Sequence, residues 1–283
     1  MANTEGSAPA HYDSFATSYD EIWRVPGIRP LLPLLTSTLE SVGPHKDIAV
    51  LDLACGTGIG LRIMHALGAR RFVGVDISTQ MLEVAKSNTP PGTELYAADC
   101  ARPLAETVPA LKDEQGHFDV VLGMWLLNYA PSAAELAGMW ANVAAYLKPG
   151  GRFVGTMENH EAVTAPRLQS GKYGVTETEL NPLPGGHAED GFQVHLRFRT
   201  EPVVEFDAFR MRKDVFEREA AKAGMINLQY KRPGLDEVKK MVAEGIGGPE
   251  AADEAWWAEL LDEAPNLVVM AKKQGVSQAW LSN

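Results

Sequence analysis

The sequence predicts an α/β protein built on a doubly wound, mostly parallel sheet. Short apolar segments typical of buried strands alternate along the chain with segments typical of helices. The first of these strands, residues 48–53, leads directly into a glycine-rich loop and then a helical segment. Three successive strands end at Asp52, Asp76 and Asp99, and the carboxyl ends of parallel strands share one edge of a sheet.

Composition limits the possible classes of function. The chain of 283 residues suits one α/β domain with an insertion, and its 45% hydrophobic and 22% charged residues are typical of a globular protein. A net charge of −11 argues against nucleic acid, which is bound mainly through clustered Lys and Arg. Residues 1–10 do not resemble a signal peptide and no apolar run could cross a bilayer, so we expect a cytoplasmic protein without a membrane partner.

The chain is expected to begin with a disordered stretch, residues 1–10, followed by a helix over residues 11–23. Four aromatic residues of this helix recur at spacings of three and four, which places them on one face: Tyr12, Phe15, Tyr19 and Trp23. Packing against the domain is the simpler explanation of this face. Trp23 is also a candidate for contact with a substrate.

The loop after the first strand separates two classes of cofactor. Its glycines allow tight turns and a close approach to a ligand: Gly56, Gly58 and Gly60. A dinucleotide fingerprint requires a third glycine at the position of Leu61, and the charge of Asp52 would repel a pyrophosphate. The loop therefore favours a positively charged cofactor over a dinucleotide.

The remaining elements follow from apolar periodicity and from turn residues. Helices are expected at 30–39, 61–67, 78–86, 133–147, 213–223, 235–242 and 252–261, with a short helix or turn at 104–111. Strands are expected at 71–75, 93–98, 119–123, 152–157, 226–231 and 266–272. Ser78 is a predicted N-cap, and residues 148–151 should end a helix through a glycine and a proline.

Residues 159–210 are expected to form an insertion that covers the substrate site. Glycines and prolines mark an irregular first half, whereas residues 192–199 and 203–210 alternate apolar and polar side chains across a turn at residues 200–202. The second half therefore predicts a β-hairpin. Residues 274–283 are expected to form a flexible tail.

Several spaced motifs resemble those of the class I S-adenosylmethionine-dependent methyltransferases. They are Val50-Leu51-Asp52-Leu53-Ala54-Cys55-Gly56-Thr57-Gly58, Val73-Gly74-Val75-Asp76-Ile77-Ser78 with Met81, Ala98-Asp99-Cys100, Phe118-Asp119-Val120-Val121 and Leu147-Lys148-Pro149-Gly150-Gly151. The opening residues 12–20 are similar to small-molecule methyltransferases of ubiquinone and toxoflavin biosynthesis. The resemblance implies one domain over residues 11–273, with a Rossmann-like sheet of seven strands whose last strand is antiparallel.

The resemblance also implies S-adenosylmethionine as the cofactor and S-adenosylhomocysteine as the product. Asp76 would bind the ribose hydroxyls, and Tyr12 and Tyr19 would close over the cofactor. The full set of expected cofactor residues is Tyr12, Tyr19, Asp52, Ala54, Gly56, Gly58, Asp76, Ile77, Met81, Asp99, Cys100, Ala101, Met124 and Trp125. Trp125 is equally well explained as a core residue. The two cysteines, Cys55 and Cys100, fall in these motifs and are not expected to form a disulfide.

The sequence gives weaker signals for the residues that would contact the methyl acceptor. Methyl transfer needs a base only when the acceptor must lose a proton, and the expected catalytic residues are His160, Glu158 and Tyr129, with His187 and His195 as weaker candidates for the base. Expected substrate contacts are Trp23, Asn128, Tyr129, His195 and Arg197. Arg197, Arg199 and Arg210 could bind an acidic substrate, although a solvated face explains them more simply. No residues have the spacing of metal ligands.

These residues predict methyl transfer to an oxygen or nitrogen of a small metabolite in specialised metabolism, by a monomer or homodimer. Two alternatives remain open. The first is a catalytically silent regulatory protein that binds S-adenosylmethionine or S-adenosylhomocysteine. The second is an NAD-dependent reductase, which the missing third glycine disfavours.

Overall fold

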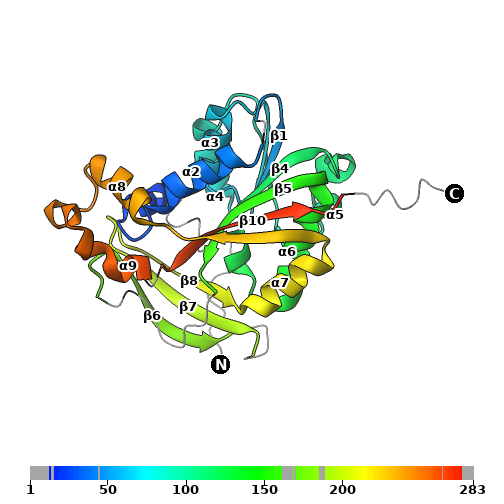
Figure 1. The fold of residues 1–283 in the computed structure, drawn as a ribbon. Helices are drawn as coiled ribbons and strands as arrows, with labels where there is room; N and C mark the ends of the chain where they lie inside the picture. Colours follow the sequence, from blue (N-terminus) through cyan, green and yellow to red (C-terminus); the bar gives the residue numbers. More distant parts are fainter. Residues whose placement is uncertain are drawn as a thin grey trace.

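The computed structural model describes residue 13 and residues 16–43, 45–160, 168, 170–184, 189–262 and 264–275. A seven-stranded sheet in the order β3-β2-β1-β4-β5-β10-β9 forms its centre (Figure 1). These strands are β1 (Ala49–Leu53), β2 (Arg71–Asp76), β3 (Glu94–Ala97), β4 (Phe118–Met124), β5 (Leu147–Glu158), β9 (Met225–Lys231) and β10 (Asn266–Lys273). Strand β10 is antiparallel to both neighbours, and β1 to β5 are parallel, which confirms the expected Rossmann-like sheet.

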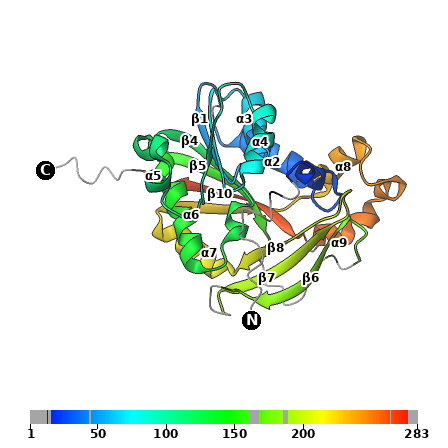
Figure 2. The ribbon, with the colours of Figure 1, turned by 180° about the vertical axis from the view of Figure 1, so that it is seen from behind.

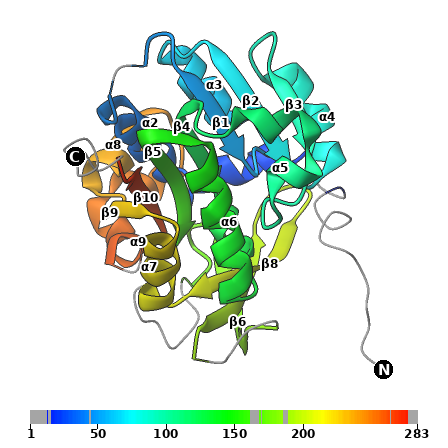
Figure 3. The same cartoon turned by 90° about the vertical axis from the view of Figure 1, so that its right-hand side faces the viewer.

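Helices cover both faces of this sheet because its strands are apolar on both sides. The helices are α2 (Leu31–Ser41), α3 (Ile59–Ala66), α4 (Thr79–Asn88), α5 (Leu104–Thr107), α6 (Ala133–Tyr146), α7 (Lys213–Lys222), α8 (Leu235–Ala243) and α9 (Ala258–Asp262). Val50 packs in a core with residues of α2 and α3, whereas the next residue, Leu51, packs in a second core with residues of α6 and α7. Figure 3 shows the face that carries α6 and α7.

A second, smaller sheet contains three antiparallel strands, β6 (Val175–Pro182), β7 (Gly191–Phe198) and β8 (Val204–Met211). It lies below the main sheet in Figures 1 and 2, and β8 packs on the 3₁₀ helix η3 (Leu126–Tyr129) that follows β4. The predicted hairpin is present as β7 and β8. The prediction of an irregular stretch before it is wrong for β6, which is an edge strand and therefore tolerates Pro182 at its end.

Two predicted helices differ from the structure. Asp13 is α-helical as expected, but the described residues 16–18 form a turn and the 3₁₀ helix η1 (Tyr19–Arg24) follows, so one helix does not continue to Trp23. Tyr12 and Phe15 lie outside the described residues. The single helix expected at 252–261 is divided into η4 (Pro249–Ala252), η5 (Glu254–Trp257) and α9. Asp253 accepts a hydrogen bond from Ala255 N at 3.0 Å, so its side chain starts a new turn.

Two local predictions concern the ends of helices. Ser78 caps α4, because its hydroxyl accepts a hydrogen bond from Met81 N at 3.1 Å, as expected. Residues 148–151, predicted to end the preceding helix, instead belong to β5, which begins at Leu147 and contains Gly150 at φ +78°. Helix α6 has already ended at Tyr146. No helix in the described ranges is both long enough and apolar enough to cross a membrane.

Candidate functional site

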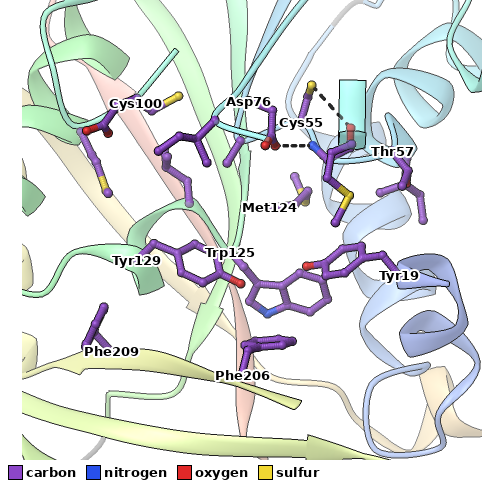
Figure 4. Close-up of a pocket in the computed structure, with 18 of the residues that line it drawn as sticks. Tyr19, Cys55, Thr57, Asp76, Cys100, Met124, Trp125, Tyr129, Phe206 and Phe209 are labelled. Atoms are coloured by element: carbon purple, nitrogen blue, oxygen red, sulfur yellow. Dashed lines mark hydrogen bonds between the residues drawn. The ribbon is translucent and has the colours of Figure 1, made fainter. Parts of the chain in front are cut away.

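A cavity of about 790 Å³ lies at the carboxyl ends of β1, β2, β3 and β4 (Figure 4). Its lining residues come from the ends of these strands and the loops after them, from helices η1, α3, α4, η3 and α6, and from strands β7 and β8. Cavities of this size hold cofactors and small ligands in other proteins. The crevice of the doubly wound sheet is therefore open to a ligand and also touches the inserted sheet.

The loop after β1 turns through left-handed backbone conformations. Ala54, Gly56 and Gly58 have φ values of +60°, +53° and +91°. A Cβ built on Gly56 would meet nothing within 4 Å, whereas one on Gly58 would lie 2.3 Å from Thr89 Cγ2. Gly58 is thus required by packing under the loop, and Gly56 leaves room for a ligand above it. Of the three, Ala54 and Gly56 line the cavity and Gly58 does not.

Asp76 is a wall carboxylate held by backbone N–H groups. It accepts hydrogen bonds from Gly56 N at 2.7 Å and from Ser78 N at 2.9 Å, and only 7% of the residue is exposed. Burial raises the pKa of its carboxyl above the ordinary value, and the backbone hydrogen bonds partly oppose this change. A carboxylate fixed by two backbone donors at the end of β2 retains acceptor capacity for the two hydroxyls of a ribose.

Asp52 does not share the rim with Asp76, which corrects the expectation that three aspartates converge there. It is fully buried and is absent from the cavity wall, and neither of its side-chain oxygens has a hydrogen-bond partner among the described residues. A Cβ on Gly60 would lie 2.6 Å from Asp52 Oδ2, so α3 packs directly against this carboxyl. Burial and the nearby charge of Asp76 raise the pKa of Asp52 to about 8.

The loop after β3 offers Asp99 and Cys100 to the cavity, but not Ala101. The Ala101 N–H donates to Asp99 Oδ1 at 2.8 Å, so the expected contact of this N–H with adenine is wrong in this arrangement. Asn142 on α6 holds the loop, since its Nδ2 donates to Cys100 O at 2.8 Å and to Arg102 O at 2.7 Å. Cys100 is a free, buried thiol whose pKa is raised by burial.

Aromatic rings form the centre of the cavity wall, where Figure 4 shows Tyr19, Trp125 and Tyr129 between the β2 side and the inserted sheet. Trp125 has a φ of +57°, and its Nε1 donates to Asn266 Oδ1 at 3.0 Å. Its ring centroid lies 4.7 Å from that of Trp23. Trp125 is therefore both a core residue and a wall residue, and the same is true of Trp23.

The inserted sheet contributes Phe206, Asp207, Phe209 and His195 to the wall. His195 on β7 pairs with Asp207 on β8, with 2.8 Å between His195 Nδ1 and Asp207 Oδ1. Gln193 Nε2 donates to the second oxygen of Asp207 at 2.6 Å. The carboxylate is thus held at both oxygens, and the imidazole is oriented by one of them.

The expected catalytic residues after β5 lie away from the cavity. His160 packs edge-on against Phe216 and Tyr230, with ring centroids at 5.5 Å and 4.5 Å, on the α7 side of the sheet. Glu158 is buried and forms an ion pair with Arg210 at 2.9 Å. The placement of both as bases at the acceptor is therefore wrong, because each side chain is absent from the cavity wall.

Of the other residues expected to contact the acceptor, some line the cavity and some do not. Tyr129 and His195 line the cavity, whereas Asn128 lines a neighbouring space of about 20 Å³ and accepts a hydrogen bond from Glu158 N. Arg197 is exposed and pairs with Glu205 at 3.3 Å, so it does not contact the cavity. Arg210, considered for an acidic substrate, is buried in its ion pairs. Tyr12 and His187 lie outside the described residues.

The sequence did not identify every wall residue. Those missed are Cys55, Thr57, Ile59, Ala98, Leu126, Glu135, Met139, Phe206, Asp207 and Phe209. One signal was present for Asp207, because a hairpin whose turn is centred on residue 201 places residue 207 directly opposite His195. The other expected wall residues are present, namely Ile77, Met81 and Met124.

In comparisons with known proteins, this chain is similar to methyltransferases. Residues 50–151 match a family model described as a methyltransferase domain. The chain is 36% identical over 128 residues to a ubiquinone biosynthesis O-methyltransferase of Burkholderia ambifaria, covering 44% of this chain and 51% of that protein. It is 34% identical over 125 residues to an mRNA cap guanine-N(7) methyltransferase of Candida glabrata, covering 41% of this chain and 30% of that protein. The chain thus spans about half the length, or less, of these relatives.

A solved structure extends the likeness beyond the matched motifs. The S-adenosylmethionine dependent methyltransferase of Mesorhizobium loti superposes with a TM-score of 0.55 at 19% identity, over 86% of this chain and 98% of that one. At this identity the superposition shows a shared fold.

Proposed function

Because the chain belongs to the class I S-adenosylmethionine-dependent methyltransferases, we propose that it transfers a methyl group to an oxygen or nitrogen of a small molecule. One observation carries the proposal above all. Asp76 is fixed by two backbone N–H groups at the end of β2, and beside it lies a cavity large enough for a cofactor and an acceptor together.

The wall residues fit S-adenosylmethionine by their chemistry. Asp76 would accept from the ribose hydroxyls, Asp99 and Ile77 would lie beside the adenosine, and the loop around Gly56 would receive the methionine part. The carboxylates on this side of the wall suit a cofactor that carries positive charge. When bound, the cofactor supplies an activated methyl group on a sulfonium sulfur.

The chain's own contribution would be alignment and exclusion of water. Trp125, Tyr129 and Phe206 line the cavity beyond the expected cofactor region, and apolar rings there would hold an acceptor in line with the methyl group. The inserted sheet would cover the acceptor, since Phe206 and Phe209 reach the wall from β8.

A small acceptor is favoured over a macromolecule for two reasons. The net charge of −11 opposes binding to nucleic acid, and the cavity is walled on one side by the inserted sheet. The Burkholderia relative, named for ubiquinone biosynthesis, supports methylation of oxygen on a small molecule. We place this reaction in specialised metabolism in the cytoplasm, carried out by a monomer or homodimer.

The proposal is tested by methyl transfer from S-adenosylmethionine labelled in its methyl group to a fractionated metabolite extract. We expect label in a low-molecular-mass product with the wild type, and at least about tenfold less with Asp76→Ala, because the loss of a charged hydrogen-bond acceptor weakens cofactor binding. Asp113→Ala, a change at an exposed residue of η2 (Pro109–Glu114), serves as the matched control. A wild type that binds S-adenosylhomocysteine but labels no product would support the silent regulatory protein instead.

A further inference from the structure

The described wall of the cavity contains carboxylates but no fixed positive charge. Its acidic residues are Asp76, Asp99, Glu135 and Asp207, and no Lys or Arg occurs among the described residues that line it. An anionic group on the acceptor would lose hydration and meet these carboxylates, and among the described wall residues it would find no Lys or Arg to pair with. The described part of the wall therefore disfavours acceptors that carry a phosphate or a carboxylate.

The part of the wall nearest the inserted sheet suits a flat, apolar molecule. Four aromatic rings line this part, with Phe206 and Phe209 below Trp125 and Tyr129 in Figure 4. Aromatic side chains hold rings by stacked or edge-on contacts, which add specificity to apolar burial. An aromatic ring is thus the acceptor skeleton that best matches this wall.

One titratable pair, His195 and Asp207, also lines the cavity. Asp207 is an acceptor held through Oδ2 by Gln193, and it accepts from His195 Nδ1 through Oδ1. In a neutral imidazole with its proton on Nδ1, Nε2 is an acceptor of a proton. A carboxylate in this position both orients the ring and stabilises the imidazolium that forms after proton transfer.

From these observations we propose that the acceptor is an uncharged aromatic molecule methylated on a ring hydroxyl, and that His195 removes the proton of that hydroxyl. This proposal rests on the proposed function and specifies its acceptor. A phenolic hydroxyl has a pKa near 10, so it is largely protonated at neutral pH and benefits from a base. An acceptor whose reacting group is already deprotonated at neutral pH would not need a base.

The proposed step conserves atoms and charge. The hydroxyl oxygen attacks the methyl carbon, and the carbon–sulfur bond breaks with its electron pair retained by sulfur. The hydroxyl proton passes to His195 Nε2, and the imidazolium beside Asp207 later releases it to water. The products are the aryl methyl ether and S-adenosylhomocysteine.

The first test compares two probes of equal shape and different charge, 4-methylcatechol and 3,4-dihydroxybenzoate. We expect kcat/KM for 4-methylcatechol to exceed that for the acid by at least about tenfold, because a buried carboxylate would be unpaired. An equal rate, a preference for the acid, or no transfer to either probe would overturn this proposal. Transfer of label to a non-aromatic product of the extract would then leave the proposed function intact.

The second test separates a base from a structural residue. We expect His195→Asn to lower kcat with 4-methylcatechol by at least about a hundredfold, the lower range for general base catalysis, with KM and S-adenosylhomocysteine affinity nearly unchanged. Asp207→Asn should also lower kcat by at least about a hundredfold, because the new amide can donate to Nδ1 and leave the ring proton on Nε2, the nitrogen that must accept the hydroxyl proton.

A matched control is the cross-strand pair two residues further along β7 and β8. Arg197 pairs with Glu205 across β7 and β8 as His195 pairs with Asp207, but neither Arg197 nor Glu205 lines the cavity. Arg197→Asn should leave kcat within about twofold of the wild type, because exposed ion pairs contribute little. A His195→Asn enzyme with the kcat of this control would overturn the role of His195.

Discussion

Arg210 on β8 lies 2.9 Å from Glu158 at the end of β5, and this ion pair joins the inserted sheet to the main sheet. The same Arg210 nitrogen lies 2.7 Å from Glu177 on β6. All three residues are buried. The cluster therefore fixes the position of β8, whose Phe206 and Asp207 line the cavity, relative to the carboxyl ends of the central strands.

Arg210→Met should lower the free energy of unfolding by about 3–5 kcal/mol, because it leaves two buried carboxylates without their cation. Arg197→Met, which removes an exposed pair on the same sheet, should change this free energy by about 1 kcal/mol or less. Urea denaturation at neutral pH measures both. Equal effects of the two substitutions would show that the buried cluster does not hold the sheets together.

Asp52 should make stability fall as pH rises. Its pKa is about 8 in the folded protein and about 3.9 in an unfolded chain. Between these values the folded state binds the extra proton, so the free energy of unfolding decreases with increasing pH, and this contribution is lost once the pH exceeds the folded pKa.

Asp52→Asn cannot ionise and should remove this dependence. The unfolding free energy of the variant minus that of the wild type should rise by up to about 1.4 kcal/mol per pH unit between roughly pH 5 and pH 7, because only the wild type loses stability as the pH rises. Urea denaturation at several pH values measures this difference. Asp113→Asn, at an exposed residue, should give no such slope. Parallel curves for wild type and Asp52→Asn would contradict a buried, protonated carboxyl.

Asp20 ties the segment that carries Tyr19 and Trp23 to the loop after β1. The Thr57 hydroxyl donates to Asp20 Oδ1, and Thr57 is buried in the cavity wall. Asp20→Ala should weaken S-adenosylhomocysteine binding by about threefold to tenfold, the scale of one such hydrogen bond.

The neighbouring Glu21 gives the control for Asp20, since its side chain pairs with Arg24 at the surface and does not line the cavity. Glu21→Ala should leave the affinity unchanged in the same calorimetric titration, because exposed pairs contribute little. If Asp20→Ala also left the affinity unchanged, η1 would have no part in holding the ligand.

The sequence was informative wherever local pattern decides structure. The apolar run before Asp52, the glycines after it and the capping residue Ser78 act through neighbouring residues, so the β1–loop–α3 unit and the start of α4 could be predicted. The edge strand β6 could not, because its glycine and proline borders resemble those of a loop until β7 pairs with it.

The residues of the site were harder to predict than the fold, because membership of the site depends on the direction in which each side chain points. His160 follows β5 as expected, but it faces the rings of Phe216 and Tyr230, and a position after a strand does not determine the face. Asp52 lies within β1, one residue before its end and close to the loop, yet its side chain lies beneath α3. Asp207 became visible only through its partner across the hairpin, His195.

We propose above all that Asp76 and the adjacent cavity bind the adenosine of S-adenosylmethionine. Calorimetric titration with S-adenosylhomocysteine, and separately with NADH, tests it most directly. We expect one site for S-adenosylhomocysteine, no binding of NADH, and a loss of about 1.5–3 kcal/mol of binding free energy in Asp76→Ala but none in Asp113→Ala. No binding of S-adenosylhomocysteine to the wild type, or an unchanged affinity in Asp76→Ala, would contradict it.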